Sequence, residues 1–375
     1  MPLVPLTFPP GVYRNGTDYQ STGRWRDASL VRWADGTMRA VGGWAPRFDG
    51  ADAVPRGAHV WRDLTNNRRV AFGTWDKLYA VSQAGVITDI TPAGLTTGNA
   101  AATMNMGYGG GLYGSGLYGT PRSDSGSYVE ATTWSIDNWG EELVACSNAD
   151  GKLYQWDLNV VNDGVAITNA PTGCSGLVAT EERFLFTLSA GGNPRLVQWC
   201  DREANTVWTP AATNEAGDLE LQTSGQIMQG IRTRGQTLVL TDIDAHAATY
   251  QGPPFIYGFE RVGSSCGAIS RKAAAAVDRG VFWMGAGSFF IYSGGVVQEL
   301  PCEVVDYVFS EMNTSYRSHI WAVSNAANSE VWWFYPSTSA TECDRYVSFN
   351  YLEGHWATGT LDRTAGVDRG VFATP

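Results

Sequence analysis

Lysine is almost absent from this chain of 375 residues. Only Lys77, Lys152 and Lys272 occur among its 26 lysine and arginine residues. The excess of arginine suits rigid ion pairs at interfaces, although a coding bias explains it equally well. Charged residues make up 17% of the sequence, below the usual quarter. No apolar run reaches the roughly 18 residues that a membrane-spanning helix needs, and the opening MPLVPLTFPPG lacks the basic start of a signal peptide. We therefore expect neither a membrane span nor a secretion signal.

Metal-binding motifs are also missing. No CxxC pair occurs, so a zinc or redox motif is not predicted, and we expect buried, reduced thiols instead. The four histidines are isolated from one another in the sequence. Asp242-x-Asp244 lacks the glycine and the glutamate of an EF-hand loop, so we interpret it as a solvated turn. The cysteines are Cys146, Cys174, Cys200, Cys266, Cys302 and Cys343.

Catalytic and cofactor motifs are equally scarce. The glycines Gly109, Gly111 and Gly114 match a GxGxxG spacing, but the strand before them and the helix after them are lacking. Close acidic pairs occur at Glu141-Glu142, Glu181-Glu182 and Asp218/Glu220, and we interpret them as exposed turn residues. The sequence therefore predicts no enzyme, no cofactor and no metal site.

Charge is distributed unevenly along the chain. The net charge is −11, yet residues 1–72 carry ten arginines against six acidic residues. An acidic surface argues against general affinity for nucleic acid, because such binding depends on neutralising phosphates. The basic first part of the chain includes four arginines that we consider for docking to an acidic partner. They are Arg14, Arg24, Arg26 and Arg32.

The stretch from Gly280 to Leu300, GVFWMGAGSFFIYSGGVVQEL, predicts three short strands joined by tight glycine turns. Its beginning, VDRGVF at 277–282, recurs unchanged at 367–372. Comparable pairs of runs appear along the chain, and their first runs begin 40–53 residues apart, except for one spacing of 74 that contains an insertion. The starts are Val70, Val144, Leu185, Leu238, Val281, Val331 and Val371. A period of about 40–50 residues is typical of propeller blades.

We therefore predict an all-β protein, a β-propeller of six or seven blades. Residues 69–375 form the propeller, and residues 1–68 form an N-terminal arm with a hairpin around Asp35-Gly36. One short amphipathic helix is predicted at 303–312, from apolar residues at helical spacing after Pro301. The lone last run, GVFATP, suggests closure by the hairpin at 29–44 or by residues beyond this chain.

A long insertion lies at about 95–135. Its segment 106–128 reads MGYGGGLYGSGLYGTPRSDSGSY. Tyrosine offers a large amphipathic contact area, and glycine lets the backbone approach a partner closely. We predict an interaction loop or a loop facing a channel, with a flexible insertion as the alternative. The side chains proposed for contact are Tyr108, Leu112, Tyr113, Leu117 and Tyr118.

Three long stretches resemble a family of bacteriophage virion structural proteins. They are FPPGVYRNGTDYQSTGRWRDASLVRWADGTMRAVGGW near the start, GYGGGLYGSGLYGTPR, and LPCEVVDYVFSEMN. The resemblance covers most of the chain, in order, and is to the β-propeller tail nozzle, or hub, of short-tailed phages. It implies a protein of the virion tail, assembled in the host cytoplasm, without catalytic residues.

The resemblance also implies partners: a homo-oligomeric ring, usually a hexamer, with tail adaptor or other connector proteins, tail fibres, and genomic DNA that passes without tight binding. The expected function is a channel for DNA ejection. Two alternatives remain open from the sequence. One is a receptor-binding module for sugars, with Trp134, Trp139 and Tyr128 as stacking residues. The other is a propeller glycoside hydrolase, which needs two carboxylates about 5–10 Å apart.

Overall fold

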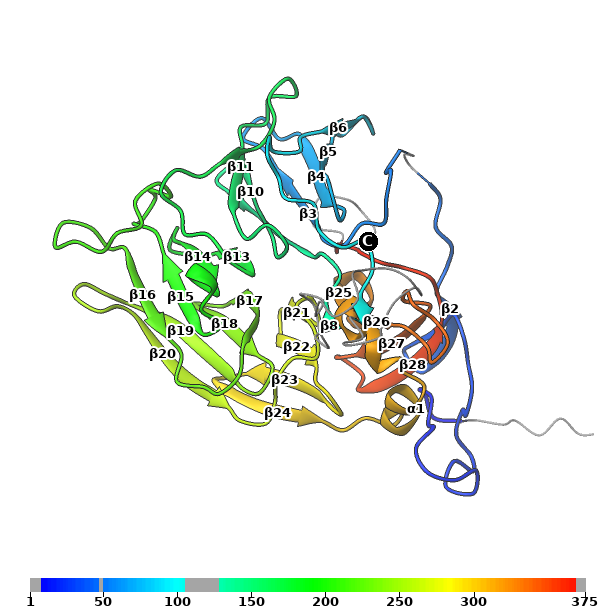
Figure 1. The fold of residues 1–375 in the computed structure, drawn as a ribbon. Helices are drawn as coiled ribbons and strands as arrows, with labels where there is room; N and C mark the ends of the chain where they lie inside the picture. Colours follow the sequence, from blue (N-terminus) through cyan, green and yellow to red (C-terminus); the bar gives the residue numbers. More distant parts are fainter. Residues whose placement is uncertain (1–7, 47–49, 105–127, 369–375) are drawn as a thin grey trace, which may run out of the picture.

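Six four-stranded antiparallel sheets surround a central axis, as Figure 1 shows. The computed structural model describes residues 8–46, 50–104 and 128–368, and within these ranges the chain forms a six-bladed β-propeller. Each blade is built from four consecutive strands, and from blade 1 to blade 6 the first strand of each blade lies beside the first strand of the blade that follows it in the chain. The predicted all-β propeller fold is confirmed. No helix in the described ranges is long and apolar enough to cross a membrane.

The first three blades occupy residues 58–220. Blade 1 consists of β3 Ala58–Arg62, β4 Arg68–Gly73, β5 Leu78–Val81 and β6 Ile87–Asp89. Blade 2 consists of β9 Trp134–Trp139, β10 Glu142–Ser147, β11 Leu153–Trp156 and β12 Val165–Ala166. Blade 3 consists of β13 Gly176–Ala179, β14 Leu185–Leu188, β15 Leu196–Trp199 and β16 Gly217–Glu220, with the 3-10 turn η1 Ala190–Gly192 between β14 and β15.

The last three blades occupy residues 227–360. Blade 4 consists of β17 Ile227–Thr233, β18 Gln236–Thr241, β19 Ala245–Gly252 and β20 Ile256–Gly263. Blade 5 consists of β21 Ala274–Val277, β22 Gly280–Met284, β23 Phe289–Ser293 and β24 Val296–Leu300. Blade 6 consists of β25 Trp321–Asn325, β26 Glu330–Tyr335, β27 Arg345–Asn350 and β28 His355–Thr360, with the 3-10 turns η2 Thr314–His319 before β25 and η3 Ala326–Asn328 after it.

The repeated runs in the sequence are the middle strands of the blades. Six of the predicted starts fall in or at the second strands, from β4 to β26, and the seventh, Val371, lies outside the described residues. The first strands were missed because they carry little apolar periodicity, as in AAAV of β21.

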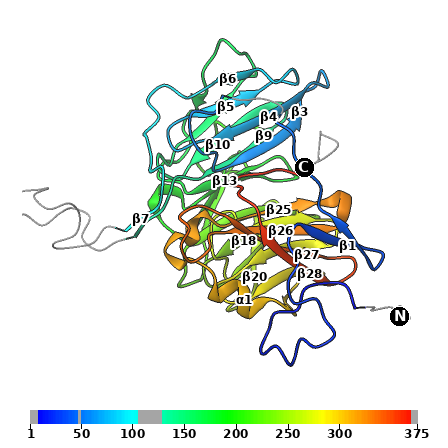
Figure 2. The same cartoon turned by 90° about the vertical axis from the view of Figure 1, so that its right-hand side faces the viewer.

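The propeller begins earlier than its predicted start at residue 69. Strand β3 opens at Ala58 and pairs along its length with β4, so part of the predicted arm belongs to blade 1. The predicted insertion separates blades 1 and 2. Its described ends form a short pair of strands, β7 Thr103–Met104 and β8 Tyr128–Val129, and Figure 2 shows β7 at one face of the propeller. The Gly/Tyr residues 105–127 lie outside the described residues.

The predicted helix is confirmed as α1, Val305–Ser310. Val304, Val308 and Met312 are buried in the apolar cluster between blades 5 and 6, as the helical spacing predicts. This packing gives the helix a structural role against the propeller.

The N-terminal hairpin does not close the propeller by adding a strand. Its strands β1 Val31–Ala34 and β2 Thr37–Ala40 pair only with each other and turn at Asp35-Gly36, both with φ above 50°. The hairpin lies against blade 6, where Arg32 makes two hydrogen bonds of 3.1 and 3.2 Å to the buried carboxylate of Glu330. Closure by this hairpin was therefore a wrong expectation, because every blade already has four strands of its own.

At five of the six blade interfaces, the two neighbouring blades pack together through one continuous apolar cluster, a different cluster at each interface. Examples are Trp156 between blades 1 and 2 and Trp283 between blades 4 and 5. At the sixth interface, the described residues of blades 6 and 1 form two separate clusters, one around Trp321 and the other around Phe72. Here residues 361–368 run along β25, where the carbonyl of Arg363 accepts a hydrogen bond from Trp321 Nε1 at 3.0 Å. The closing interface is thus built differently from the others.

Candidate ligand site at the mouth of the central channel

Residues at or just before the beginnings of the first strands of blades 1, 2, 4, 5 and 6 line a cavity of about 120 Å³. This is the space of about four water molecules at roughly 30 Å³ each. It opens beside the sixth blade interface, next to residues 364–366. The polar and aromatic side chains that line it include Arg56, Thr133, Gln229, Lys272, His319 and Trp321.

Arg56 crosses from blade 1 to blade 6. Its guanidinium is buried and donates to both carboxylate oxygens of Glu342, at 2.5 and 3.2 Å, and to the carbonyl of Ala100 at 2.8 Å. Burial by itself raises the pKa of Glu342, but hydrogen bonds from His319 and Arg56 outweigh it and hold that pKa below its ordinary value. Glu342 is therefore a carboxylate that neutralises Arg56 across the closing interface.

His319 is held in one orientation beside this pair. Its Nε2 accepts a hydrogen bond from the backbone N–H of Ala102 at 3.2 Å, so Nε2 carries no proton. Its Nδ1 lies 3.4 Å from Oε2 of Glu342. Ala100 and Ala102 precede the Gly/Tyr insertion, so that end of the insertion is anchored at the channel mouth.

Two more cations near the channel are matched by carboxylates. Arg271 donates to Glu130 at 3.0 Å, and Arg232 donates to Asp137 at 2.9 Å. Asp137 also accepts the backbone N–H of Ala179 at 3.0 Å, which fixes its carboxylate on the inner face of the blades.

His59, on β3, faces the same carboxylate from the other side. Its Nε2 lies 3.1 Å from Oδ1 of Asn138 and 3.9 Å from Asp137. Burial lowers the pKa of His59, and the negative charge of Asp137 only partly opposes this. The imidazole is therefore neutral at neutral pH and does not add to the positive charge of the channel.

Lys272 differs from its neighbours because its amine is unmatched. In the described part of the chain, its Nζ forms no hydrogen bond and no ion pair. Its backbone is fixed by a parallel bridge to Trp321 and by a 2.8 Å hydrogen bond from Ala322 N–H to its carbonyl. Burial lowers the pKa of Lys272 to about 8, while the charge of Asp137 acts in the opposite direction. The cavity is thus lined by one neutralised arginine, Arg56, and by the amine-bearing Lys272, while Arg271 beside Lys272 is bound to Glu130.

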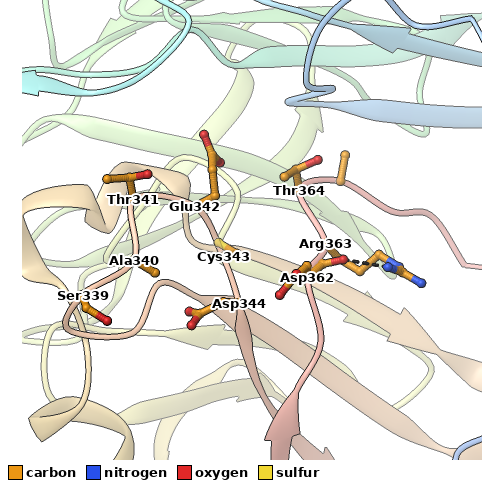
Figure 3. Close-up of a pocket in the computed structure, with 10 residues that line it drawn as sticks. Ser339, Ala340, Thr341, Glu342, Cys343, Asp344, Asp362, Arg363 and Thr364 are labelled. Carbon is orange, nitrogen blue, oxygen red and sulfur yellow. Dashed lines mark hydrogen bonds between the residues drawn. The ribbon is translucent and has the colours of Figure 1, made fainter.

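A second hollow, of about 540 Å³, lies near the cavity. Figure 3 shows the residues that line it. It lies between the β26–β27 loop and residues 362–365, and it shares Thr364 and Ala365 with the cavity. Glu342 lines this hollow while its carboxylate binds Arg56 on the other side. The two spaces are therefore neighbours at the sixth blade interface.

The opposite end of the channel carries an open basin of about 660 Å³. Its rim holds charges of both signs, such as the exposed Arg234 and Asp278, whose nearest charged atoms lie 4.0 Å apart. Such exposed pairs contribute little, and the basin shows no preference for one ligand charge.

The four arginines proposed for docking to a partner all have partners within the chain. Arg24 pairs with Glu303 at 2.6 Å and Arg26 with Asp18 at 2.6 Å. Arg14 lies 3.6 Å over the ring of Tyr307 and 3.6 Å from Asp27, and Arg32 binds Glu330 as described above. Arg24 and Arg14 thus hold the N-terminal arm against the segment of α1, Arg32 holds it against blade 6, and Arg26 pairs within the arm. The side chains Tyr108, Leu112, Tyr113, Leu117 and Tyr118 lie outside the described residues.

The residues proposed for sugar binding are not brought together. Trp134 is 1% exposed and donates through Nε1 to the carbonyl of Thr74, so it belongs to the core. Trp139 packs under Arg183, whose guanidinium lies 5.3 Å from its ring.

The close acidic pairs, which we interpreted as turn residues, lie on different blades, and one member of each has a local partner. Glu142 binds Gln155, Glu182 accepts the hydroxyl of Tyr257, and Glu220 pairs with Arg195.

The buried thiols are confirmed for five cysteines, and Cys302 is partly exposed. The solvated turn at Asp242-x-Asp244 was wrong for its second residue. Asp244 is 3% exposed and accepts hydrogen bonds from Thr241 and Thr223. It lies 3.1 Å from His246, so it organises a buried turn.

The channel-mouth residues were missed because they come from four distant parts of the chain. Arg56, Lys272, His319 and Glu342 share no local motif, and only closure of the ring brings them together. One signal was present for Lys272. It is one of three lysines and directly precedes AAAAV, an apolar run that favours burial.

Comparison with known proteins gives likeness of fold only. No family model matches the chain, and no curated protein matches it. Among solved structures, virginiamycin B lyase from Staphylococcus aureus is 9% identical, with 83% of this chain and 85% of that chain covered and a TM-score of 0.48. A streptogramin B lyase is 10% identical, with coverages of 84% and 87% and a TM-score of 0.48. The computationally designed Ika8 protein is 13% identical, with coverages of 84% and 98% and a TM-score of 0.37.

These comparisons correct two expectations. The two natural proteins are enzymes built on a propeller, and neither is a phage tail protein. The function as a tail nozzle, with its ring and DNA channel, is therefore withdrawn, as is the expectation that the chain is no enzyme. The resemblance to the phage family stays a prediction from sequence. At these identities the likeness does not transfer lyase activity to this chain.

Proposed function

We propose that this propeller binds a small carboxylate molecule at the mouth of its central channel, with Lys272 as the cation that receives it. The observation that carries this proposal is the amine of Lys272, which borders the cavity without a partner among the described residues. An unpaired charge in a partly desolvated position is unfavourable. A bound anion removes that penalty, so the site favours an anionic ligand.

Charge matching around the cavity supports an anion over a cation. Arg56, which lines the cavity, and Arg271, beside Lys272, each have a carboxylate partner, which leaves the charge of Lys272 in excess. The whole chain is acidic, with a net charge of −11. Because the rest of this acidic protein does not attract anions, an anionic ligand is drawn to the local positive charge at this site and not to the surrounding surface.

The size of the cavity limits the ligand. A space of about 120 Å³ accommodates a molecule of a few non-hydrogen atoms, and the adjoining hollow of about 540 Å³ admits a longer substituent. Small polar ligands of this kind gain at most about 1.5 kcal/mol per non-hydrogen atom, so we expect a dissociation constant on the order of 1 mM for a minimal ligand.

Glycolate tests the proposal because it has a carboxylate and no carbonyl group. Ligand-observed NMR at pH 7 is expected to show binding to the wild-type chain and to the variant Lys272→Arg, which keeps the charge. Binding is expected to weaken at least about tenfold in Lys272→Met. The matched controls Lys77→Met and Lys152→Met leave the cavity intact and should bind as wild type. Equal binding by wild type and Lys272→Met, or none by wild type, would contradict the proposal.

A further inference from the structure

Lys272 is also placed to react, not only to bind. A primary amine is a nucleophile only in its neutral form, and lysine is activated for this role when it is desolvated. The amine of Lys272 combines this environment with access to a cavity and with a rigid backbone, held on Trp321 and Ala322. Because Nζ has no hydrogen-bond partner in the described part of the chain, no intramolecular bond must break before it attacks.

We propose that Lys272 forms an imine with a small carboxylate that also carries an aldehyde or ketone, a deeper assignment that rests on the function proposed above. The lone pair of the neutral amine attacks the carbonyl carbon, so that a C–N bond forms as the π bond of the carbonyl breaks, and one proton moves from nitrogen to the oxygen. The second proton of the nitrogen then passes to this hydroxyl group, the C–O bond breaks with loss of water, and a C=N bond forms. No oxidant or metal is consumed.

The surroundings of Lys272 make this reaction selective. Its charged and titratable neighbours are Asp137 and His59 on the inner strands, Cys146 on β10, and Arg271 beside it. Burial raises the pKa of the Cys146 thiol well above its ordinary value, so this thiol does not compete as a nucleophile. His59 is neutral, and Arg271 is bound to Glu130.

The other two lysines provide an internal control. Lys77 binds Asp52 at 3.0 Å and Asp89 at 3.4 Å, and these carboxylates raise its pKa above the ordinary value. Lys152 lies 3.4 Å from Asp150. Both amines are therefore engaged by carboxylates, and Lys272 stands apart within one and the same chain.

Reductive trapping with glyoxylate and sodium cyanoborohydride tests the inference. Glyoxylate matches glycolate in size and charge but has the carbonyl. Reduction of the imine leaves a carboxymethyl group, which peptide mass spectrometry assigns to one lysine. At pH 7 to 8 we expect the adduct on Lys272 at least about tenfold faster than on Lys77 or Lys152. The rate on Lys272 should rise as the pH passes about 8, where its amine loses its proton.

The variants separate the two proposals. Lys272→Arg should bind glycolate yet yield no adduct at residue 272, and an excess of glycolate should slow trapping in the wild type. Binding of glycolate at Lys272 without faster trapping there overturns the imine and leaves the binding function standing. Trapping spread evenly over the three lysines also overturns it. Failure of glycolate to bind, or to slow trapping, counts against the binding function itself.

Discussion

Five blade interfaces are sealed by apolar side chains, whereas the sixth is bridged by polar groups. Between blades 4 and 5, Trp283 is fully buried and donates to the carbonyl of Cys266 at 2.6 Å. Between blades 6 and 1, Arg56 and Glu342 form the bridge, and residues 361–368 lie alongside β25. The polar interface is also where the cavity opens. The difference suggests that the apolar interfaces supply stability, while the closing interface gives up some of it for a ligand site.

The largest effect is expected at an apolar interface. Trp283→Ala removes a fully buried indole from the cluster shared by blades 4 and 5, so the free energy of unfolding should fall by about 3–5 kcal/mol. Urea denaturation followed by fluorescence or circular dichroism measures this loss. The milder Trp283→Phe keeps most of the packing and should lose less. If Trp283→Ala lowers the free energy of unfolding no more than Glu342→Gln at the sixth interface does, the apolar interfaces are not the main source of stability.

The charged amine of Lys272 is expected to lower the stability of the fold, so removing it should raise the free energy of unfolding. Lys272→Met should raise the free energy of unfolding at pH 7 by about 1–3 kcal/mol, because a desolvated charge is lost. The folded-state pKa is lowered from 10.5 to about 8. Below pH 8 both the folded and the unfolded chain carry the charge and the penalty is complete. Between pH 8 and 10.5 the folded chain releases its proton first, so the penalty and the gain of the variant decline.

Stability measured from pH 7 to 10 checks this dependence. The difference between Lys272→Met and wild type should shrink steadily as the pH rises. Lys152→Met is the control: Asp150 keeps its hydrogen bonds from Thr96 N–H and the Tyr154 hydroxyl, so little change is expected. The assignment of a desolvated amine would be contradicted if Lys272→Met were no more stable than wild type at pH 7, or if its advantage in free energy of unfolding grew as the pH rose.

The bridge at the sixth interface should contribute a smaller amount. Glu342→Gln leaves the buried guanidinium of Arg56 without its counterion, but the side chain of Glu342 is 39% exposed, which allows solvent to compensate. We expect a loss of about 1–2 kcal/mol in urea denaturation. The matched control is Glu220→Gln, because Glu220 and Arg195 form an ion pair on the outer edge of blade 3 with both side chains 42% exposed. This control should lose less than about 0.5 kcal/mol.

The smallest effect is expected when both members of the bridge are replaced. The double variant Arg56→Met with Glu342→Gln leaves no uncompensated buried charge, so it should be closer to wild type in stability than Glu342→Gln alone. A double-mutant cycle in urea gives the coupling energy. If the two losses simply add, Arg56 and Glu342 are not coupled, and the polar closure of the ring is wrong.

The sequence predicted the propeller well because its middle strands are strongly patterned. Runs such as GVFWM of β22 repeat at the blade period, and α1 follows from the spacing of Val304, Val308 and Met312. The blade starts were less clear, because first strands such as AAAV of β21 carry weak signals. The hairpin was located correctly, but its position against blade 6 depends on the contact of Arg32 with Glu330, which no local pattern encodes.

The candidate site was beyond prediction from local sequence. Arg56 and Glu342 are separated by 286 positions, and each is unremarkable in its own segment. What distinguishes Lys272 is that its amine has no partner within residues 8–46, 50–104 and 128–368, and that property appears only when the surrounding blades are in place. Most predicted site residues were chosen by residue type, whereas this site is defined by how charges are matched in three dimensions.

The protonation of Lys272 is the most direct test of its unmatched, desolvated state. Reductive dimethylation with ¹³C-labelled formaldehyde gives one NMR signal for each of the three lysines, and Lys77→Arg, Lys152→Arg and Lys272→Arg assign them. A pH titration of these signals measures the pKa of each amine in the folded chain. The signal lost in Lys272→Arg should titrate near pH 8, while the pKa of Lys77 should lie above its ordinary value. A pKa for Lys272 at or above its ordinary value of 10.5 would contradict the account.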